Sequence, residues 1–264
     1  MMGFQIVVLW SDVLIWLLVA AGCAAAYAIA GSGPLLSAWR RVGGSRAGMA
    51  AATVLMLFVL IGLLDSLHYR VRLDGRPGER ATYAVEVLSA FDALAAPLRL
   101  RSEKTYSAPF ATRLYARETL EIPGQGQVRD FPRLRFGGAH LAGREDEVAA
   151  DVGFMAFKAA ILGFLAWVAL AAAITAILAR RQGVSHGQAA GAIWRGATPF
   201  AWNAVLATLG ILLLTLVPLG WLAGSYHVLG TDKVGQDVLY QVLKSVRTGL
   251  IIGLVTTLVT LPLA

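Results

Sequence analysis

The chain has 264 residues, of which 57% are apolar and only 15% are charged, against about 45–50% and about 25% in a soluble globular protein. This composition excludes an ordinary soluble domain and indicates a chain that lies largely in a membrane. The formal charge of +7 does not by itself indicate nucleic-acid binding, because most of the charges fall between Tyr69 and Asp151, and we expect no nucleic-acid partner.

Long apolar runs predict membrane-spanning helices, each of which needs about 20 apolar residues to cross a bilayer. Four complete runs cover residues 13–30, 49–64, 157–178 and 199–223. A fifth run covers residues 249–264, and no cationic residue follows it. We therefore expect an all-α membrane bundle of four complete transmembrane helices and a truncated fifth. On this interpretation the sequence is a fragment, or further chain or a second chain completes the bundle.

Arginines in two short loops predict the orientation. These loops, residues 31–47 and 179–198, contain no Asp or Glu, and their arginines are Arg40, Arg41, Arg46, Arg180, Arg181 and Arg195. Positively charged residues are enriched in cytoplasmic loops. We therefore expect both loops in the cytoplasm, and the N-terminus and residues 68–153 outside. Asp12, Asp65 and Lys158 stand at helix ends, where we expect them to cap a helix or reach the membrane interface.

Residues 68–153 have the composition of a soluble domain and predict a small extracytoplasmic α/β or α+β domain. Tyr69, Val71 and Leu73 alternate with arginines, a pattern typical of a strand. Residues 74–78 predict a turn. Residues 82–96 have helical spacing, and Pro97 is expected to end that helix.

No residues in this outer segment have the spacing of a catalytic or metal site. The acidic run 145–147 is typical of a solvated surface, and His140 has no second ligand at metal spacing. No base is placed by the sequence to activate Ser107. We therefore expect no enzyme activity, no metal and no cofactor in this chain, and a docking or structural role for the domain.

The most informative stretch is residues 226–239, YHVLGTDKVGQDVL. Leu229 and Gly230 predict a turn, after which Thr231 or Asp232 is expected to cap a helix. Residues 237–246 are amphipathic and are expected to rest at the outer membrane interface before the chain turns inward at Gly249.

This stretch resembles the outer segment of the second-subunit permeases of dipeptide, oligopeptide and nickel ABC importers. Those proteins typically read His-Pro-Leu-Gly-Thr-Asp, two variable residues, and Gly-Arg-Asp-Val-Leu. The matching positions are His227, Leu229, Gly230, Thr231, Asp232, Gly235, Asp237, Val238 and Leu239, followed by Arg247, Leu250 and Gly253. Val228 replaces the proline and Gln236 the arginine, and a second block departs at Ser245, Val246 and Gly249. The match covers residues 227–264.

The resemblance implies a permease subunit, or its N-terminal part, in an importer of peptides or similar small solutes. Its implied partners are a second permease subunit, ATP-binding subunits, an extracytoplasmic substrate-binding protein and membrane lipid. ATP is then expected on the partner subunits, and the location is the bacterial cytoplasmic (inner) membrane.

The same resemblance divides the chain into four parts. Residues 1–67 are a two-helix N-terminal membrane extension, and residues 68–153 are the extracytoplasmic domain, a candidate to dock the binding protein. Residues 154–198 hold the third transmembrane helix and a cytoplasmic loop. Residues 199–264 are the incomplete start of the permease transmembrane domain.

Two alternatives stay open. A membrane-anchored sensor or assembly factor, which binds a ligand through its outer domain, explains the extension and the missing Glu-Ala-Ala-like coupling segment. It leaves the match of residues 227–239 unexplained. A membrane enzyme comes third, because the sequence offers no catalytic set.

Overall fold

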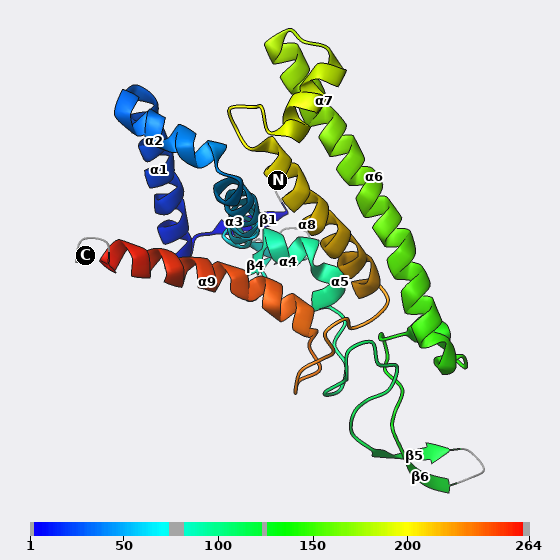
Figure 1. Ribbon diagram of the computed structural model, residues 1–264. Coiled ribbons are helices and arrows are strands. Elements are labelled where there is room, and N and C mark those ends of the chain that lie inside the picture. The colour runs from blue at the N-terminus through cyan, green and yellow to red at the C-terminus, as the bar shows by residue number, and fades with distance from the viewer. Residues whose placement is uncertain (1–2, 74–81, 123–125, 261–264) are drawn as a thin grey trace. The chain divides into compact units, whose positions relative to one another are not determined.

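The computed structural model describes residues 3–73, 82–122 and 126–260. Within these ranges, five helices are long and apolar enough to cross a membrane: α1 (Trp10–Gly31), α3 (Arg46–Asp65), α6 (Val148–Gln182), α8 (Trp202–Ala223) and α9 (Val238–Thr260). These ranges also contain a small antiparallel sheet of four strands, β1 to β4 (Figure 1). The fold is therefore that of a largely helical, multi-pass membrane protein. The turn predicted over residues 74–78 lies outside the described residues.

The chain divides into two compact units. The first comprises Met1–Ala28, Met56–Arg101 and Val238–Ala264, and the second comprises Ile29–Leu55 and Ser102–Asp237. The segment expected to form one outer domain, residues 68–153, is divided between these units after Arg101. Each half of that segment folds with membrane helices.

The first unit contains a sheet that the sequence predicted only in part. Strand β2 (His68–Leu73) confirms the strand predicted from alternating residues. It pairs antiparallel with β1 (Phe4–Val7), which the sequence did not predict, and with two short strands, β3 (Thr82–Tyr83) and β4 (Leu88–Ser89). Because β1 precedes α1 and β2 follows α3, their pairing holds the start of α1 beside the end of α3.

The helix predicted over residues 82–96 is wrong in its first half, where the chain forms β3 and β4. Helix α4 (Ala90–Leu94) begins only after Ser89, whose hydroxyl accepts from the N–H of Asp92 while the Asp92 carboxylate accepts from the N–H of Ser89. This reciprocal capping defines a helix start. Pro97 does not end the helical region; it lies in the first turn of α5 (Ala96–Arg99), where its missing N–H has no cost.

Helix α9 is continuous from Val238 to Thr260. The expected separate interfacial segment over residues 237–246 is therefore the first part of this helix. Its apolar residues Tyr240 and Leu243 pack with Phe91 and Ala95, so this face contributes to a small protein core.

The second unit is built on the antiparallel pair of α6 and α8, which lie side by side (Figure 1). Close packing depends on glycine: a Cβ atom at Gly163 of α6 would lie 2.8 Å from the carbonyl oxygen of Leu213 in α8. Small residues allow such backbone approach in membranes. The indole N–H of Trp167 also donates to the Leu206 carbonyl at 2.7 Å.

Helix α6 has 35 residues, which corresponds to about 52 Å and exceeds the roughly 30 Å of a bilayer core. It follows the hairpin of β5 (Glu118–Ile122) and β6 (Gly126–Asp130) and two short 3-10 turns, η1 (Ala139–Leu141) and η2 (Glu145–Glu147). Its first turns carry Asp151, which bonds to Tyr226 just after α8.

Two amphipathic helices occupy the arginine-containing loops of the second unit, α2 (Gly33–Gly44) and α7 (His186–Arg195). Helix α7 joins the end of α6 to the start of α8, so it lies at the opposite end of that pair from Tyr226. Helix α2 also meets the start of α8, because the N–H of Ala201 donates to the carbonyl of Gly43 at 2.9 Å.

Candidate functional site

The segment that connects α8 to α9, residues 224–237, is the candidate site, and we call it the motif loop. It packs against the chain of residues 103–110 and 136–138 through backbone hydrogen bonds. The N–H of Glu103 donates to the Gly235 carbonyl at 2.8 Å, and the N–H of Phe110 donates to the His227 carbonyl at 3.0 Å. The motif loop is thus docked along its length on the outer segment of the second unit.

His227 is the centre of the motif loop. Its Nδ1 donates to Asp237 at 2.7 Å and its Nε2 donates to Glu103 at 3.3 Å. All three side chains are at most 4% exposed. An imidazole that donates from both nitrogens is the protonated cation, so a buried imidazolium lies between two carboxylates.

The electrostatics of this group follow from its partners. Burial alone would lower the pKa of His227, but its hydrogen bonds to Asp237 and Glu103, together with their charges, raise the pKa to about 9. Burial would raise the pKa of Glu103, but hydrogen bonds from His227 and from three backbone N–H groups lower it to about 2. Those N–H groups belong to residues 135–137 and lie at 2.8, 2.7 and 3.2 Å. His227 and Glu103 are therefore both charged at neutral pH.

Two glycines let the motif loop approach its support. Gly230 and Gly235 have φ of 76° and 77°, a left-handed conformation that favours glycine. A Cβ atom would lie 2.3 Å from the carbonyl oxygen of Ser107 at position 230 and 1.9 Å from that of Glu103 at position 235. Any side chain at either position would push the motif loop away from residues 103–110.

Thr231 and Asp232 stabilise the middle of the motif loop. The Thr231 hydroxyl donates to the Thr105 carbonyl at 2.8 Å and lies 3.1 Å from the hydroxyl oxygen of Ser107. Asp232 accepts from the N–H groups of Val234 and Gln236 at 3.0 and 2.8 Å. The expectation that one of these residues caps the following helix is therefore wrong: Asp232 caps the turn before it, and α9 begins at Val238.

The turn at the start of the motif loop forms without the family's proline. The N–H of Gly230 donates to the carbonyl of His227 at 3.0 Å, and Val228 between them is buried. Leu229, by contrast, is 43% exposed, so packing does not explain its match to the family.

His140 has a partner that the sequence did not reveal. Its Nε2 lies 2.8 Å from Asp151, which also accepts from the Tyr226 hydroxyl at 2.6 Å. Burial and the carboxylate of Asp151 both raise the pKa of Tyr226. These bonds attach the motif loop to α6. In the described ranges, no group of three His, Cys, Asp or Glu side chains is arranged to hold a metal ion.

The structure brings together six of the predicted motif residues, His227, Gly230, Thr231, Asp232, Gly235 and Asp237. Leu229 also lies in the motif loop but is exposed, and the remaining predicted positions lie on α9. Val238 and Leu239 begin α9, and Gly253 lies further along it, where an added Cβ atom would meet nothing within 4 Å.

Arg247 belongs to a second polar cluster, contained in the first unit. Its guanidinium bonds to Asp12 of α1 and lies 3.9 Å from Asp65 of α3. Asp12 also accepts from His68 at 3.0 Å, and Asp65 accepts from the Ser89 hydroxyl at 2.7 Å. We call this group, with Asp92, Tyr240 and Lys244, the aspartate cluster.

Lys244 and Tyr240 complete the aspartate cluster on the same face of α9. Lys244 bonds to Asp92 and lies 3.5 Å from Asp65, and the Tyr240 hydroxyl donates to Asp92 at 2.7 Å. Asp12 and Asp65 are only 1% and 2% exposed. Of the two roles expected for these residues, capping is confirmed for Asp12, which accepts from the N–H of Leu9, and both carboxylates are buried against partners within the protein. Lys158 lies over the ring of Phe154 at 4.0 Å.

Sequence reasoning missed Glu103, His68 and Asp92. Glu103 gave no local signal, because its partners are 32 to 124 residues away. The aspartate cluster did give a signal in the sequence. Lys244 and Arg247 are two cations three residues apart on a largely apolar helix, and cations in such a helix need acidic partners.

Comparison of the chain with protein-family models, curated proteins and solved structures gave no match in any of the three. Fold and sites together define a class: a multi-pass membrane protein with a buried, ion-paired loop between its last two described helices.

Proposed function

We propose that the chain is a permease subunit, or the N-terminal portion of one, of an ABC importer. It would move peptides or similar small solutes across the bacterial cytoplasmic membrane, powered by partner ATPases. In this proposal α1, α3 and α6 are extension helices, α8 is the first helix of the transporter core and α9 is the next. The N-terminus and the motif loop lie outside.

The observation that carries the proposal is that six family-matching residues have separate, demanding roles in one loop. His227 and Asp237 form a buried ion pair, and Gly230 and Gly235 permit contacts that no side chain allows. Thr231 donates to the Thr105 carbonyl, and Asp232 caps the turn between the two glycines. A sequence that matched the family by apolar composition alone would not supply such a set. The family's residue types at these positions could build the same loop.

The motif loop suits a fixed docking platform better than a moving gate. The charges of His227 and Asp237 are paired inside the protein, while Leu229 and Val234 are 43% and 65% exposed on it. Exposed apolar groups on a rigid support are suited to binding another protein. In the proposal, this surface contributes to docking of the substrate-binding protein.

Co-purification tests the proposal. The full-length tagged chain is extracted from its native membrane in mild detergent, and its partners are identified by mass spectrometry. The expected partners are an ATP-binding subunit, a second permease and an extracytoplasmic binding protein. Recovery of a sensor kinase or of an unrelated assembly complex, with no ATPase, would favour the alternative of a sensor or assembly factor.

A further inference from the structure

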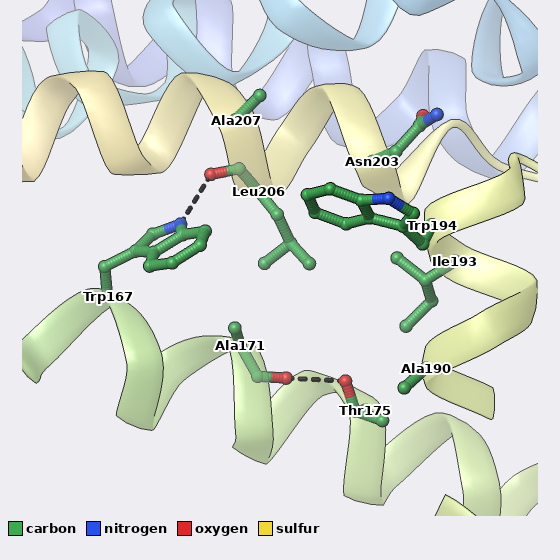
Figure 2. Close-up of a pocket in the computed structure, with 9 residues that line it drawn as sticks. All are labelled: Trp167, Ala171, Thr175, Ala190, Ile193, Trp194, Asn203, Leu206 and Ala207. Atoms are coloured by element: carbon green, nitrogen blue, oxygen red, sulfur yellow. Dashed lines mark hydrogen bonds between the residues drawn. The ribbon is translucent and has the colours of Figure 1, made fainter. Parts of the chain in front are cut away.

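A groove opens between α6, α7 and α8 of the second unit, with a volume of about 450 Å³. Figure 2 shows Trp167 and Trp194 on opposite sides of it, with Leu206 between them. The Trp167 N–H donates to the Leu206 carbonyl, and the Thr175 hydroxyl donates to the Ala171 carbonyl. Because these polar groups are already bonded within the protein, the groove is suited to an apolar occupant.

A second apolar groove, of about 670 Å³, lies beside the residues that precede α8. Its lining includes Trp39 and Val42 of α2 and Met49 of α3, together with Pro199 and Phe200 just before α8. The first groove is lined from α8 by Asn203, Leu206 and Ala207. Both grooves thus border the start of α8, and each has an exposed tryptophan in its lining.

The depth of the grooves in the bilayer follows from the helices that form them. Helices α6 and α8 are apolar and long enough to span it, whereas α2 and α7 are short, amphipathic and attached to their ends. Amphipathic helices lie in the membrane interface, where tryptophan is enriched. Trp39 and Trp194 are 56% and 81% exposed, as expected at that depth.

Arginines lie near the start of α8, beside both grooves. A Cβ atom at Gly196 would lie 3.6 Å from a guanidinium nitrogen of Arg46 and 3.3 Å from the amide nitrogen of Asn203. Arg195 is the adjacent residue, and Arg40 lines the second groove. Loops 31–47 and 179–198 contain no acidic residue, and the described residues provide no carboxylate partner for these arginines.

We propose that this end of the second unit binds an anionic phospholipid. The phosphate lies against Arg46 and Arg195, and the two acyl chains occupy the two grooves. Arginine guanidinium groups bind phosphate through paired hydrogen bonds, and basic residues near a membrane attract anionic lipids by about 1 kcal/mol each. A zwitterionic lipid can fill both grooves, but its own ammonium group cancels the charge of its phosphate, so it neutralises these arginines less well.

Native mass spectrometry of the full-length chain tests this site. The protein is purified in mild detergent and mixed with equal amounts of phosphatidylglycerol and phosphatidylcholine of the same chain length. The wild-type chain is expected to retain phosphatidylglycerol preferentially. Each arginine contributes about fivefold to that preference, from about 1 kcal/mol per basic residue. Replacement of both exposed residues, Arg46→Gln with Arg195→Gln, should therefore reduce it about 25-fold.

Matched control variants separate the effect of the arginine charges from the effect of the apolar grooves. Arg72→Gln with Arg129→Gln removes two exposed arginines from strands β2 and β6 and should leave the preference unchanged. Ala171→Phe fills the first groove and should reduce retention of both lipids, whereas Ala172→Phe, on the exposed side of α6, should not. Equal retention of the two lipids by the wild-type chain, or an unchanged preference in the Arg46 and Arg195 variant, would overturn the proposal.

Discussion

His227 and Asp237 form a 2.7 Å hydrogen-bonded ion pair that joins the start of the motif loop to its end. The two residues are ten positions apart and nearly inaccessible to solvent. Because His227 also contacts Glu103, the pair holds the motif loop to a segment more than a hundred residues away in the chain. This contact is the structural basis of the first prediction.

Asp237→Asn should destabilise the second unit by about 3–5 kcal/mol, the usual cost of removing one partner from a buried ion pair. The substitution keeps the shape of the side chain but leaves His227 with a weaker acceptor. Thermal unfolding of the detergent-solubilised chain, followed by tryptophan fluorescence, measures the effect. Asp146→Asn, on the exposed acidic run, is the matched control and should unfold like the wild type. Equal unfolding temperatures for the two variants would refute the role of this pair.

Gly235→Ala should prevent the motif loop from docking. The residue has φ of 77°, and the new Cβ atom would lie 1.9 Å from the Glu103 carbonyl oxygen. Strained backbone alone costs about 1–3 kcal/mol, and the overlap adds to it. Size-exclusion chromatography should show loss of the monodisperse peak. Gly249→Ala in α9, where a Cβ atom meets nothing within 4 Å, should elute like the wild type.

The long apolar helices were predictable from the sequence, because a run of about twenty mostly apolar residues is typical of a helix that crosses a bilayer. The β2 strand was predictable for a similar reason, since its alternation is local. Strands β3 and β4 were not, because pairing with β2 overrides the helical spacing of residues 82–96.

The sequence predicted where the motif loop lies in the chain, but not which contacts hold it. Gly230 and Gly235 indicated turns, but the function of those turns depends on Glu103, whose sequence neighbours give no sign of it. Likewise, Asp12 and Asp65 appear at helix ends in the sequence. Only the fold brings Arg247 to them.

The pH dependence of stability should depend on His227. Its pKa is raised from 6.5 to about 9 in the folded chain, so its stabilising contribution is complete below pH 6.5 and is lost as the pH rises through about 9. The pKa of Glu103 is lowered from 4.5 to about 2, so its contribution is complete above pH 4.5 and is lost only as the pH falls through about 2.

Melting temperatures measured from pH 6 to pH 10 test this assignment. The wild-type chain should lose stability toward alkaline pH, while His227→Gln should be less stable at pH 6 but show a smaller alkaline decline. Parallel curves for the two proteins would contradict the assignment, because the decline would then come from other groups.

The aspartate cluster should behave as a coupled unit. Asp12→Asn and Arg247→Gln each remove the main partner of a buried charge, so each should destabilise the first unit by about 3–5 kcal/mol. The double variant removes both charges and should cost less than the sum of the two, with a coupling of about 0.5–3 kcal/mol. Additive changes in unfolding free energy would show that this pair is not coupled.

The most direct test of the proposed importer function is solute uptake by cells that lack the gene. Uptake of labelled dipeptides, oligopeptides and nickel is measured in the parent strain, the deletion strain and the deletion strain carrying the wild-type gene. The proposal predicts that energy-dependent uptake of at least one of these solutes falls in the deletion strain and is restored by the wild-type gene but not by Gly235→Ala. Unchanged uptake of the whole panel after deletion would contradict the proposal.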